Sequence, residues 1–252
     1  MSGYDGSQRS GDAFGLALLD RHHGGLGVHI TERDDGHEDA MNADLYFLDY
    51  DQWDTFHPAT AQDRVGMEMV SGRILDVGAG AGRHALALQQ RGHEVVALDV
   101  SPGAIEVCRE RGVEQVFLGT TEDLVPEDPE PFDGAILLGH NLALLGSPEA
   151  SGPFLDSLRS LLKPGGLVVG NTLDVYQTDD PVHLAHHRMN RERGRLPGQL
   201  TLRVKFEDVV GDWFDYIFLS PGELAELVEQ AGWRVDELTE PNPSYLATLR
   251  PA

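Results

Sequence analysis

The fold of this chain is decided by the stretch from Ile74 to His84, which reads ILDVGAGAGRH. Its apolar start predicts a buried strand, and its alternating glycines predict a turn that leads into a helix. Glycine has no Cβ and tolerates positive φ, so a ligand can approach the backbone of such a turn closely. The N–H groups at the start of the helix favour a negatively charged group. The stretch therefore indicates a strand–turn–helix unit that binds a cofactor.

A second carboxylate follows in a similar position. The segment from Ala97 to Pro102 reads ALDVSP, and its strand ends in Asp99. A carboxylate there can accept hydrogen bonds from both hydroxyls of a ribose. Residues 80–85 also satisfy the Gly-x-Gly-x-x-Ala fingerprint of NAD enzymes. Asp76 favours S-adenosylmethionine instead, because a carboxylate just before the glycines can hold an ammonium group and would repel a pyrophosphate.

Composition limits the classes of partner. The 252 residues carry a formal net charge of −23, which argues against nucleic acid and anionic membranes as partners. The single cysteine, Cys108, fits a reducing compartment. Neither a signal-peptide pattern nor an apolar stretch of about 20 residues is found. We expect a cytoplasmic protein with a small-molecule substrate and no nucleic-acid or membrane partner.

Strands and helices alternate from Arg73 onward, which is typical of a parallel sheet covered on both faces. Strands are expected at 73–77, 94–99, 115–118, 133–139 and 167–173, and helices at 82–91, 102–111 and 149–162. Residues 176–220 interrupt the alternation with an expected helix (181–193) and hairpin (199–206 with 213–219). A helix at 221–232 and strands at 234–239 and 245–249 end the chain. The expected division is an N-terminal cap or lid, 1–64, and a main domain, 65–252, that contains the insertion 176–220.

The chain resembles the class I S-adenosylmethionine-dependent methyltransferases over roughly residues 65–250. The resemblance rests on the glycine turn, on Asp99 and on the segment Leu161–Val169, LLKPGGLVV. It implies an α/β, Rossmann-like fold with a seven-stranded, mostly parallel sheet and helices on both faces. Residues 32–36 and 191–199 are similar to a bacterial branch of small-molecule enzymes, and that likeness names no substrate.

The resemblance also implies a set of cofactor-binding residues. The glycine turn would lie under the methionine part of the cofactor, Asp99 would hold the ribose and Val100 would lie along the adenine. Thr120 stands where the family often has an aspartate, so the adenine contact is assigned to the residues that follow it. The cofactor-binding set is Asp76, Gly78, Ala79, Gly80, Arg83, Asp99, Val100, Thr121, Glu122 and Gly139.

His140 is the candidate catalytic residue. The segment from Leu138 to Leu142, LGHNL, resembles the Leu-Gly-Asn-Ser-Phe segment of glycine N-methyltransferases, with His140 at the Asn position. An imidazole can take a proton from the attacking group near neutral pH. The alternative is that His140 only hydrogen-bonds the cofactor or a loop.

Four residues are expected to bind the substrate: Asn141, Tyr46, His187 and Arg193. The last two belong to the basic segment 183–205, which has two interpretations. It pairs with acidic residues of the cap, including Glu32, Asp34 and Asp35, or it binds a carboxylate or phosphate on the substrate. No metal site is assigned, although His183, His186 and His187 were weighed as one.

The sequence thus predicts methyl transfer from S-adenosylmethionine to an oxygen or nitrogen atom of a small molecule. Two alternatives stay open, a non-catalytic S-adenosylmethionine-binding protein and an NAD-dependent oxidoreductase.

Overall fold

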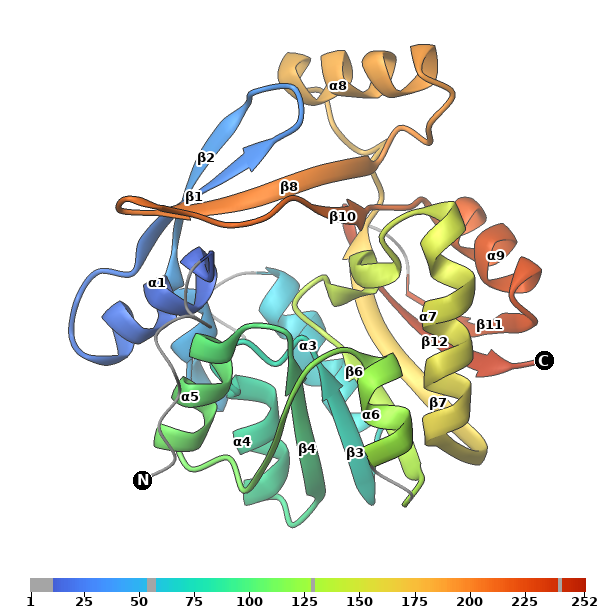
Figure 1. Cartoon of the computed structure of the whole chain (residues 1–252). Coiled ribbons are helices and arrows are strands. Elements are labelled where there is room, and N and C mark those ends of the chain that lie inside the picture. Colours follow the sequence, from blue (N-terminus) through green and yellow to red (C-terminus); the bar gives the residue numbers. More distant parts are fainter. Residues whose placement is uncertain (1–10, 54–57, 128–129, 240–241) are drawn as a thin grey trace.

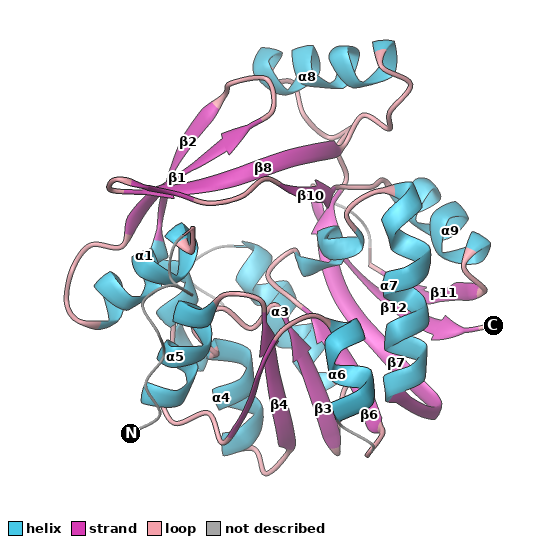
Figure 2. Ribbon diagram, viewed as in Figure 1, coloured by secondary structure: helices cyan, strands magenta, loops and turns pink. Residues whose placement is uncertain are grey.

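A seven-stranded sheet lies at the centre of the computed structural model, which describes residues 11–53, 58–127, 130–239 and 242–252 (Figures 1 and 2). Five central strands are parallel, and the last two strands of the chain are antiparallel at one edge. The spatial order is β11 (Trp233–Leu238), β12 (Ser244–Pro251), β7 (Leu162–Leu173), β6 (Phe132–Leu137), β3 (Arg73–Val77), β4 (Glu94–Asp99) and β5 (Gln115–Leu118). The predicted α/β class and sheet are therefore confirmed.

Helices cover both faces because alternate strand residues point to opposite sides. Ile74 and Ile136 face one core, while Leu75 and Leu137 face the other. The first core is covered by α3 (Pro58–Glu68), α4 (Arg83–Gln90) and α5 (Pro102–Glu110). The second is covered by α6 (Thr121–Glu127), α7 (Pro148–Leu161) and α9 (Pro221–Gln230).

A second, antiparallel sheet forms a lid over the main domain (Figure 1). Its spatial order is β10 (Phe214–Ile217), β8 (Gln199–Phe206), β1 (Val28–Arg33) and β2 (Glu38–Asn42), with β9 (Val209–Val210) paired to β8. The register sets Ile30 opposite Lys205 and Arg33 opposite Leu202. The N-terminal segment and the inserted hairpin therefore build one sheet, which we call the lid sheet. The helix α8 (Pro181–Glu192) lies beside it.

Several element boundaries differ from the expected ones. β6 ends at Leu137 instead of residue 139, because Gly139 and His140 adopt positive φ, which ends the strand. β7 begins at Leu162, five residues before the expected start. The hairpin of β1 and β2 was not predicted, because the acidic segment at its tip was interpreted as a turn only. The helices α3 and α6 were also not predicted.

The helix α1 (Ala13–His22) packs against α5 with direct contact between backbones. The Asp12 carboxylate accepts hydrogen bonds from the Ser101 hydroxyl (2.8 Å) and from the N–H groups of Gly103 (2.8 Å) and Gly15 (2.9 Å). A Cβ built on Gly103 would lie only 2.6 Å from the Gly15 Cα. Two short 3-10 helices, η2 (Ala43–Phe47) and η3 (Tyr50–Gln52), lead from the lid sheet toward α3. No helix in the described part of the chain is long and apolar enough to cross a bilayer.

The contact between α1 and α5 leads to a stability prediction. Gly103→Ala should lower the free energy of unfolding by about 1–3 kcal/mol, because the new methyl group must displace the backbone of α1. The matched control is Gly152→Ala in α7, where the added Cβ meets no atom within 4 Å. That change should stabilise the protein by about 0.5–1 kcal/mol through helix propensity. Urea unfolding of both variants checks the prediction, and equal effects would contradict it.

Candidate active site

The glycine turn between β3 and α4 has the predicted conformation. Gly78, Gly80 and Gly82 have φ values of +73°, +55° and +76°, which side chains with a Cβ rarely adopt. The N–H groups of Gly78 and Ala79 both donate to the Leu98 carbonyl, which ties the turn to β4. The turn therefore brings bare backbone to the end of the parallel sheet.

Tyr46 lies directly over this turn. A Cβ on Gly80 would be 3.1 Å from the Tyr46 ring. Burial raises the pKa of the Tyr46 hydroxyl, the Arg83 charge counteracts this, and the Asp99 charge adds to it. The sequence placed Tyr46 with the substrate, and the structure brings it to the cofactor turn.

Asp99 ends β4 and is buried beside the turn. Its Oδ2 accepts a hydrogen bond from Gly80 N–H (2.8 Å) and its Oδ1 accepts one from Ser101 N–H (2.9 Å). Each carboxylate oxygen has a further acceptor position, so two ribose hydroxyls can still be bound. Burial raises the pKa of Asp99 to about 6, against the effect of these two backbone hydrogen bonds. The neighbouring Val100 side chain is 67% exposed, as a surface for an adenine ring requires.

Two charged side chains near the turn have buried atoms without a partner in the structure. Asp76 accepts a hydrogen bond from Ala85 N–H (3.1 Å) through Oδ2, while its Oδ1 has no partner. Arg83 donates to Asp63 through Nη2, while its Nη1 has no partner. Unsatisfied buried polar atoms are costly. The methionine part of S-adenosylmethionine carries an ammonium and a carboxylate, so these residues have the donor and acceptor chemistry that fits it.

The sequence did not single out Asp63, which connects the whole site. This buried carboxylate on α3 accepts hydrogen bonds from Arg83, from His84 Nε2 (3.3 Å), from Gly139 N–H (2.9 Å) and from Asn171 Nδ2 (2.8 Å). Burial alone would raise its pKa. The hydrogen bond from His84, the charges of His84 and Arg83 and the Gly139 N–H outweigh burial and lower the pKa to about 2. No local sequence signal marks this residue, because its partners come from three other segments.

His140 is held in an unusual backbone conformation after β6. Its φ is +68°, its N–H donates to Asn171 Oδ1 (2.7 Å), and its carbonyl accepts from the Tyr216 hydroxyl (3.1 Å). Strained backbone of this kind often occurs at functional sites. The His140 Nε2 lies 3.2 Å from Ser244 Oγ, whose hydroxyl donates to Gln62 Oε1 (2.6 Å). The Nε2 atom is therefore the donor toward Ser244, which places the basic lone pair on Nδ1.

Asn141 begins the 3-10 helix η4 (Asn141–Leu145) and contacts the glycine turn. Its Nδ2 donates to the carbonyls of Val77 (3.0 Å) and Gly78 (2.9 Å). The amide thereby fixes the turn in place. The side chain that the sequence assigned to the substrate is engaged in this contact.

The turn after β5 holds the two residues expected near the adenine. The Thr121 hydroxyl is buried against Ser157 Oγ (2.6 Å), while the Glu122 side chain is exposed. Asp123 accepts hydrogen bonds from both the N–H and the hydroxyl of Thr120 (2.9 Å each). The turn therefore keeps its shape through Thr120 and Asp123, and it leaves the Thr121 hydroxyl turned inward.

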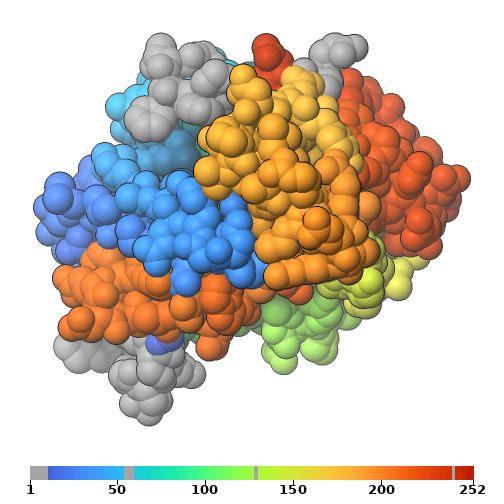
Figure 3. All heavy atoms as spheres, turned by 90° about the horizontal axis from the view of Figure 1, so that it is seen from above, coloured from blue at the N-terminus to red at the C-terminus, as the bar shows by residue number. Residues whose placement is uncertain are grey.

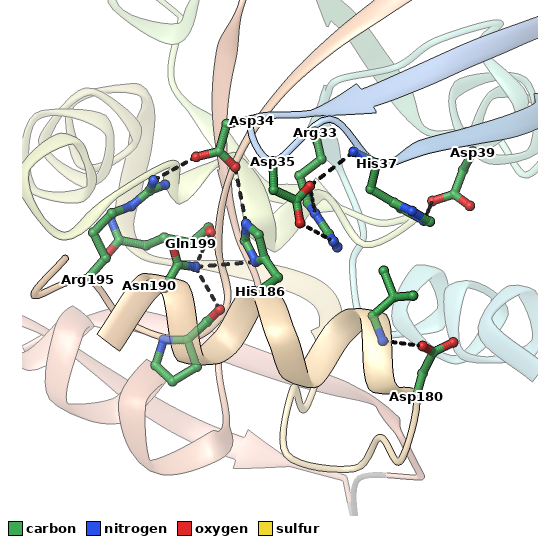
Figure 4. A network of polar contacts seen from close by, with 12 residues as sticks. Arg33, Asp34, Asp35, His37, Asp39, Asp180, His186, Asn190, Arg195 and Gln199 are labelled. Atoms are coloured by element: carbon green, nitrogen blue, oxygen red, sulfur yellow. Dashed lines mark hydrogen bonds and ion pairs between the residues drawn. The ribbon is translucent and has the colours of Figure 1, made fainter. Parts of the chain in front are cut away.

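Basic residues of segment 183–205 pair with acidic residues of the lid sheet (Figure 4). Asp34 contacts His186 (3.1 Å), Arg193 (3.3 Å) and Arg195 (3.0 Å). Glu32 contacts Arg203 (2.7 Å) and also Lys205, which in turn contacts Glu38. Of the two interpretations, internal pairing is confirmed for Glu32 and Asp34, while Asp35 pairs with Arg33 instead.

These contacts hold α8 against the tip of the hairpin formed by β1 and β2, and the two lie side by side when seen from above (Figure 3). The Asn190 amide donates to the carbonyls of Pro197 (2.9 Å) and Gln199 (2.7 Å). His187 is buried on α8, and burial, with the Arg191 charge, lowers its pKa. The predicted residues His187 and Arg193 therefore belong to the support of the lid sheet.

The three histidines weighed as a metal site do not gather in the described residues. One group there could hold a metal ion: His22 and His23 at the end of α1, with Glu110 of α5. Both histidine Nε2 atoms lie close to one Glu110 oxygen, at 3.1 and 3.2 Å. This surface group joins α1 to α5 and is no part of the glycine turn.

The buried Asp63 carboxylate leads to a pH prediction. Its pKa of about 2 lies below the ordinary value of 3.8, so it stabilises the fold above pH 4 and this contribution fades as the pH falls toward 2. Asp63→Asn should lower the free energy of unfolding at pH 7 by about 2–4 kcal/mol, because an amide N–H₂ would face other donors. The difference from the unmodified protein should shrink at pH 3.

Urea unfolding at pH 7, 4 and 3 measures both effects. The matched control is Asp156→Asn, an exposed carboxylate on α7 whose removal should change little. A difference between protein and Asp63→Asn that stays constant with pH would contradict the prediction.

Comparisons with known proteins agree with this geometry. Residues 74–166 match the family model described as a methyltransferase domain. The ubiquinone biosynthesis O-methyltransferase of Xylella fastidiosa is 37% identical over 107 residues, which cover 40% of this chain and 42% of that protein. The demethylmenaquinone methyltransferase of Clavibacter sepedonicus is 39% identical over 102 residues, 38% of this chain and 39% of that protein. The matched region thus spans about two fifths of the length of these curated relatives.

A solved structure covers nearly the whole chain. The SAM-dependent methyltransferase of Bacteroides fragilis, solved in complex with S-adenosyl-L-homocysteine, has a TM-score of 0.79 and 27% sequence identity. The alignment covers 96% of this chain and 95% of that protein, the lid sheet included. The glycine turn, the sheet order and these likenesses show that the chain belongs to the class I S-adenosylmethionine-dependent methyltransferases.

Proposed function

We propose that this chain transfers the methyl group of S-adenosylmethionine to an oxygen or nitrogen atom of a small molecule. The observation that carries the proposal is the convergence of Asp76, Arg83 and Asp99 on one glycine turn, with His140 at the end of the adjacent strand. The names of the curated relatives favour oxygen as the accepting atom. The Bacteroides fragilis structure, with S-adenosyl-L-homocysteine bound, supports the choice of cofactor.

Each residue has a chemical task in this proposal. The bound cofactor supplies an electrophilic methyl group. Asp99 accepts hydrogen bonds from the ribose, Asp76 matches the cofactor ammonium and Arg83 matches its carboxylate. His140 takes the proton of the attacking group at Nδ1, because Nε2 is directed to Ser244. The main contribution of the protein is alignment of the acceptor with the methyl group, which favours reaction by proximity.

The raised pKa of Asp99 predicts a pH dependence of cofactor affinity. Ribose hydroxyls bind the ionised carboxylate best, and with a pKa of about 6 this form is populated only as the pH rises above 6. S-adenosyl-L-homocysteine should therefore bind about tenfold more tightly at pH 7.5 than at pH 5. Asp99→Asn should bind it more weakly, by about 1–3 kcal/mol at pH 7.5, and with little change between these pH values.

Calorimetric titrations at the two pH values measure these affinities, with NAD as a second ligand. Equal affinity of the unmodified protein at both pH values would remove the carboxylate from the site. Binding of NAD alone would overturn the proposed function in favour of an oxidoreductase.

A second prediction concerns His140. If its imidazole is the base, His140→Ala should lower kcat about 10²–10⁴-fold, while the affinity for S-adenosyl-L-homocysteine changes less than threefold. The rise of kcat with pH that reports a histidine should vanish in the variant. Methyl transfer is measured with catechol and benzylamine as hydroxyl and amine acceptors.

Three outcomes separate the alternatives. A loss of His140→Ala that is confined to cofactor affinity would make His140 a binding residue. Cofactor binding without methyl transfer to either acceptor would favour the non-catalytic alternative. Transfer to one acceptor identifies the accepting atom.

A further inference from the structure

The lid sheet has one apolar and one charged face. Along β8, the residues Leu200, Leu202 and Val204 alternate with Thr201, Arg203 and Lys205. Alternate residues of a strand point to opposite faces of its sheet. The charged face holds the ion pairs of Glu32 and Glu38, so the apolar residues lie on the other face.

The apolar face is turned toward the active site. The register pairs Leu200 with Tyr216 and Leu202 with Phe214, and paired residues share a face. The Tyr216 hydroxyl donates to the His140 carbonyl, which fixes the direction of this face. We call it the inner face, made of Leu200, Leu202, Val204, Phe214 and Tyr216.

The inner face is not filled by the protein. Leu200, Leu202 and Val204 are only half-buried, and Phe214 is 42% exposed. The apolar residues of the central strands are by contrast almost completely buried. An antiparallel sheet normally buries its apolar face against a core. An apolar face that looks toward the reacting groups and stays half-exposed is suited to an apolar ligand.

Aromatic rings flank this space on two sides. On one side, Phe14 meets Tyr46 edge-on, with ring centroids 5.2 Å apart, and meets His29 at 5.9 Å. On the other side, Phe218 meets Tyr216 edge-on at 5.4 Å. Aromatic rings pair favourably with a further ring in edge-on or offset geometry. A flat aromatic ligand therefore matches these surroundings.

The cations near the lid sheet are already engaged. Arg193 and Arg195 contact Asp34, while Arg203 contacts Glu32 on the charged face. Among the described residues of β1, β8 and β10, the register places one cation on the side of the inner face, Arg33, which donates two hydrogen bonds to Asp35. A carboxylate or phosphate on the acceptor would find no uncommitted partner on this face.

We infer that the methyl acceptor is an uncharged aromatic molecule with a hydroxyl group, a phenol, whose ring and apolar substituents bind against the inner face. The inference rests on the proposed function and names its substrate class. It departs from the expectation of an acceptor with a carboxylate or phosphate. In the reaction, the phenol oxygen forms a bond to the methyl carbon as the carbon–sulfur bond breaks. The phenol proton goes to the His140 imidazole, and S-adenosylhomocysteine leaves.

The test compares acceptors that share one ring. The protein, saturated with S-adenosyl-L-homocysteine, is titrated by calorimetry with catechol, 4-propylcatechol and 3-(3,4-dihydroxyphenyl)propionate. The propyl chain should improve affinity about tenfold over catechol by burying apolar surface. The propionate, similar in length but charged, should bind at least tenfold more weakly than 4-propylcatechol, because its carboxylate loses water without gaining a partner.

Variants locate the binding surface. Phe214→Gln, at an exposed position that tolerates polar residues, and Leu202→Gln should each weaken 4-propylcatechol binding about tenfold. Both should keep the affinity for S-adenosyl-L-homocysteine within twofold. The matched control is Val210→Gln, because Val210 pairs with Lys205 on the charged face and is 48% exposed. It should change neither affinity.

Each outcome decides a separate point. Equal or tighter binding of the propionate, or no binding of any catechol while S-adenosyl-L-homocysteine still binds, would overturn the inferred substrate class and leave the proposed function standing. Light scattering that shows a dimer, converted to a monomer by Phe214→Gln, would overturn the inference in favour of a second copy of the chain on this face. Binding of 4-propylcatechol without methyl transfer from S-adenosylmethionine would sink the proposed function and leave the apolar binding surface.

Discussion

The buried carboxylate of Asp63 is the interaction on which the site depends. It accepts donors from the helix after the glycine turn, from the loop after β6 and from β7, so three segments are held in one arrangement. Asn171 passes this constraint on to the His140 backbone. A charge without water is tolerated only when it is well paired, and here the pairing also fixes geometry. The cofactor turn and the candidate base are thereby positioned by one side chain that belongs to neither.

The lid shows how a strongly acidic chain uses its few cations. The basic segment joins an inserted helix and hairpin to an N-terminal hairpin through Asp34 and Glu32, two segments about 160 residues apart in sequence. Most of these pairs are partly exposed, and such pairs stabilise weakly one by one. Their value here lies in register, because opposite charges on one face of the sheet select which strands pair. The same alternation leaves the other face apolar and directed at the reaction.

How much the sequence could predict depended on how local each feature is. The glycine turn and Asp99 lie within single strand–turn–helix units, so spacing alone predicted them. The pairing of the basic segment with Glu32 and Asp34 was foreseeable because the chain has one basic region to answer its acidic lid. Asp63 was missed because its meaning depends on donors that only the folded chain brings together. Asn141 shows a further limit, since position after β6 does not tell which way its amide points.

The helix α1 has one consequence for the order of events. One end of it is anchored through Asp12 to the loop that follows Asp99, and its Phe14 ring touches both Tyr46 and the lid sheet. A helix is a stiff rod, so the ribose loop and the acceptor wall share a single mechanical support. Two ligands that bear on one support are thermodynamically linked, and the linkage is reciprocal. Whatever a nucleoside does to this rod when it enters, an acceptor feels, and the two occupants of the enzyme are read by each other before any bond is made.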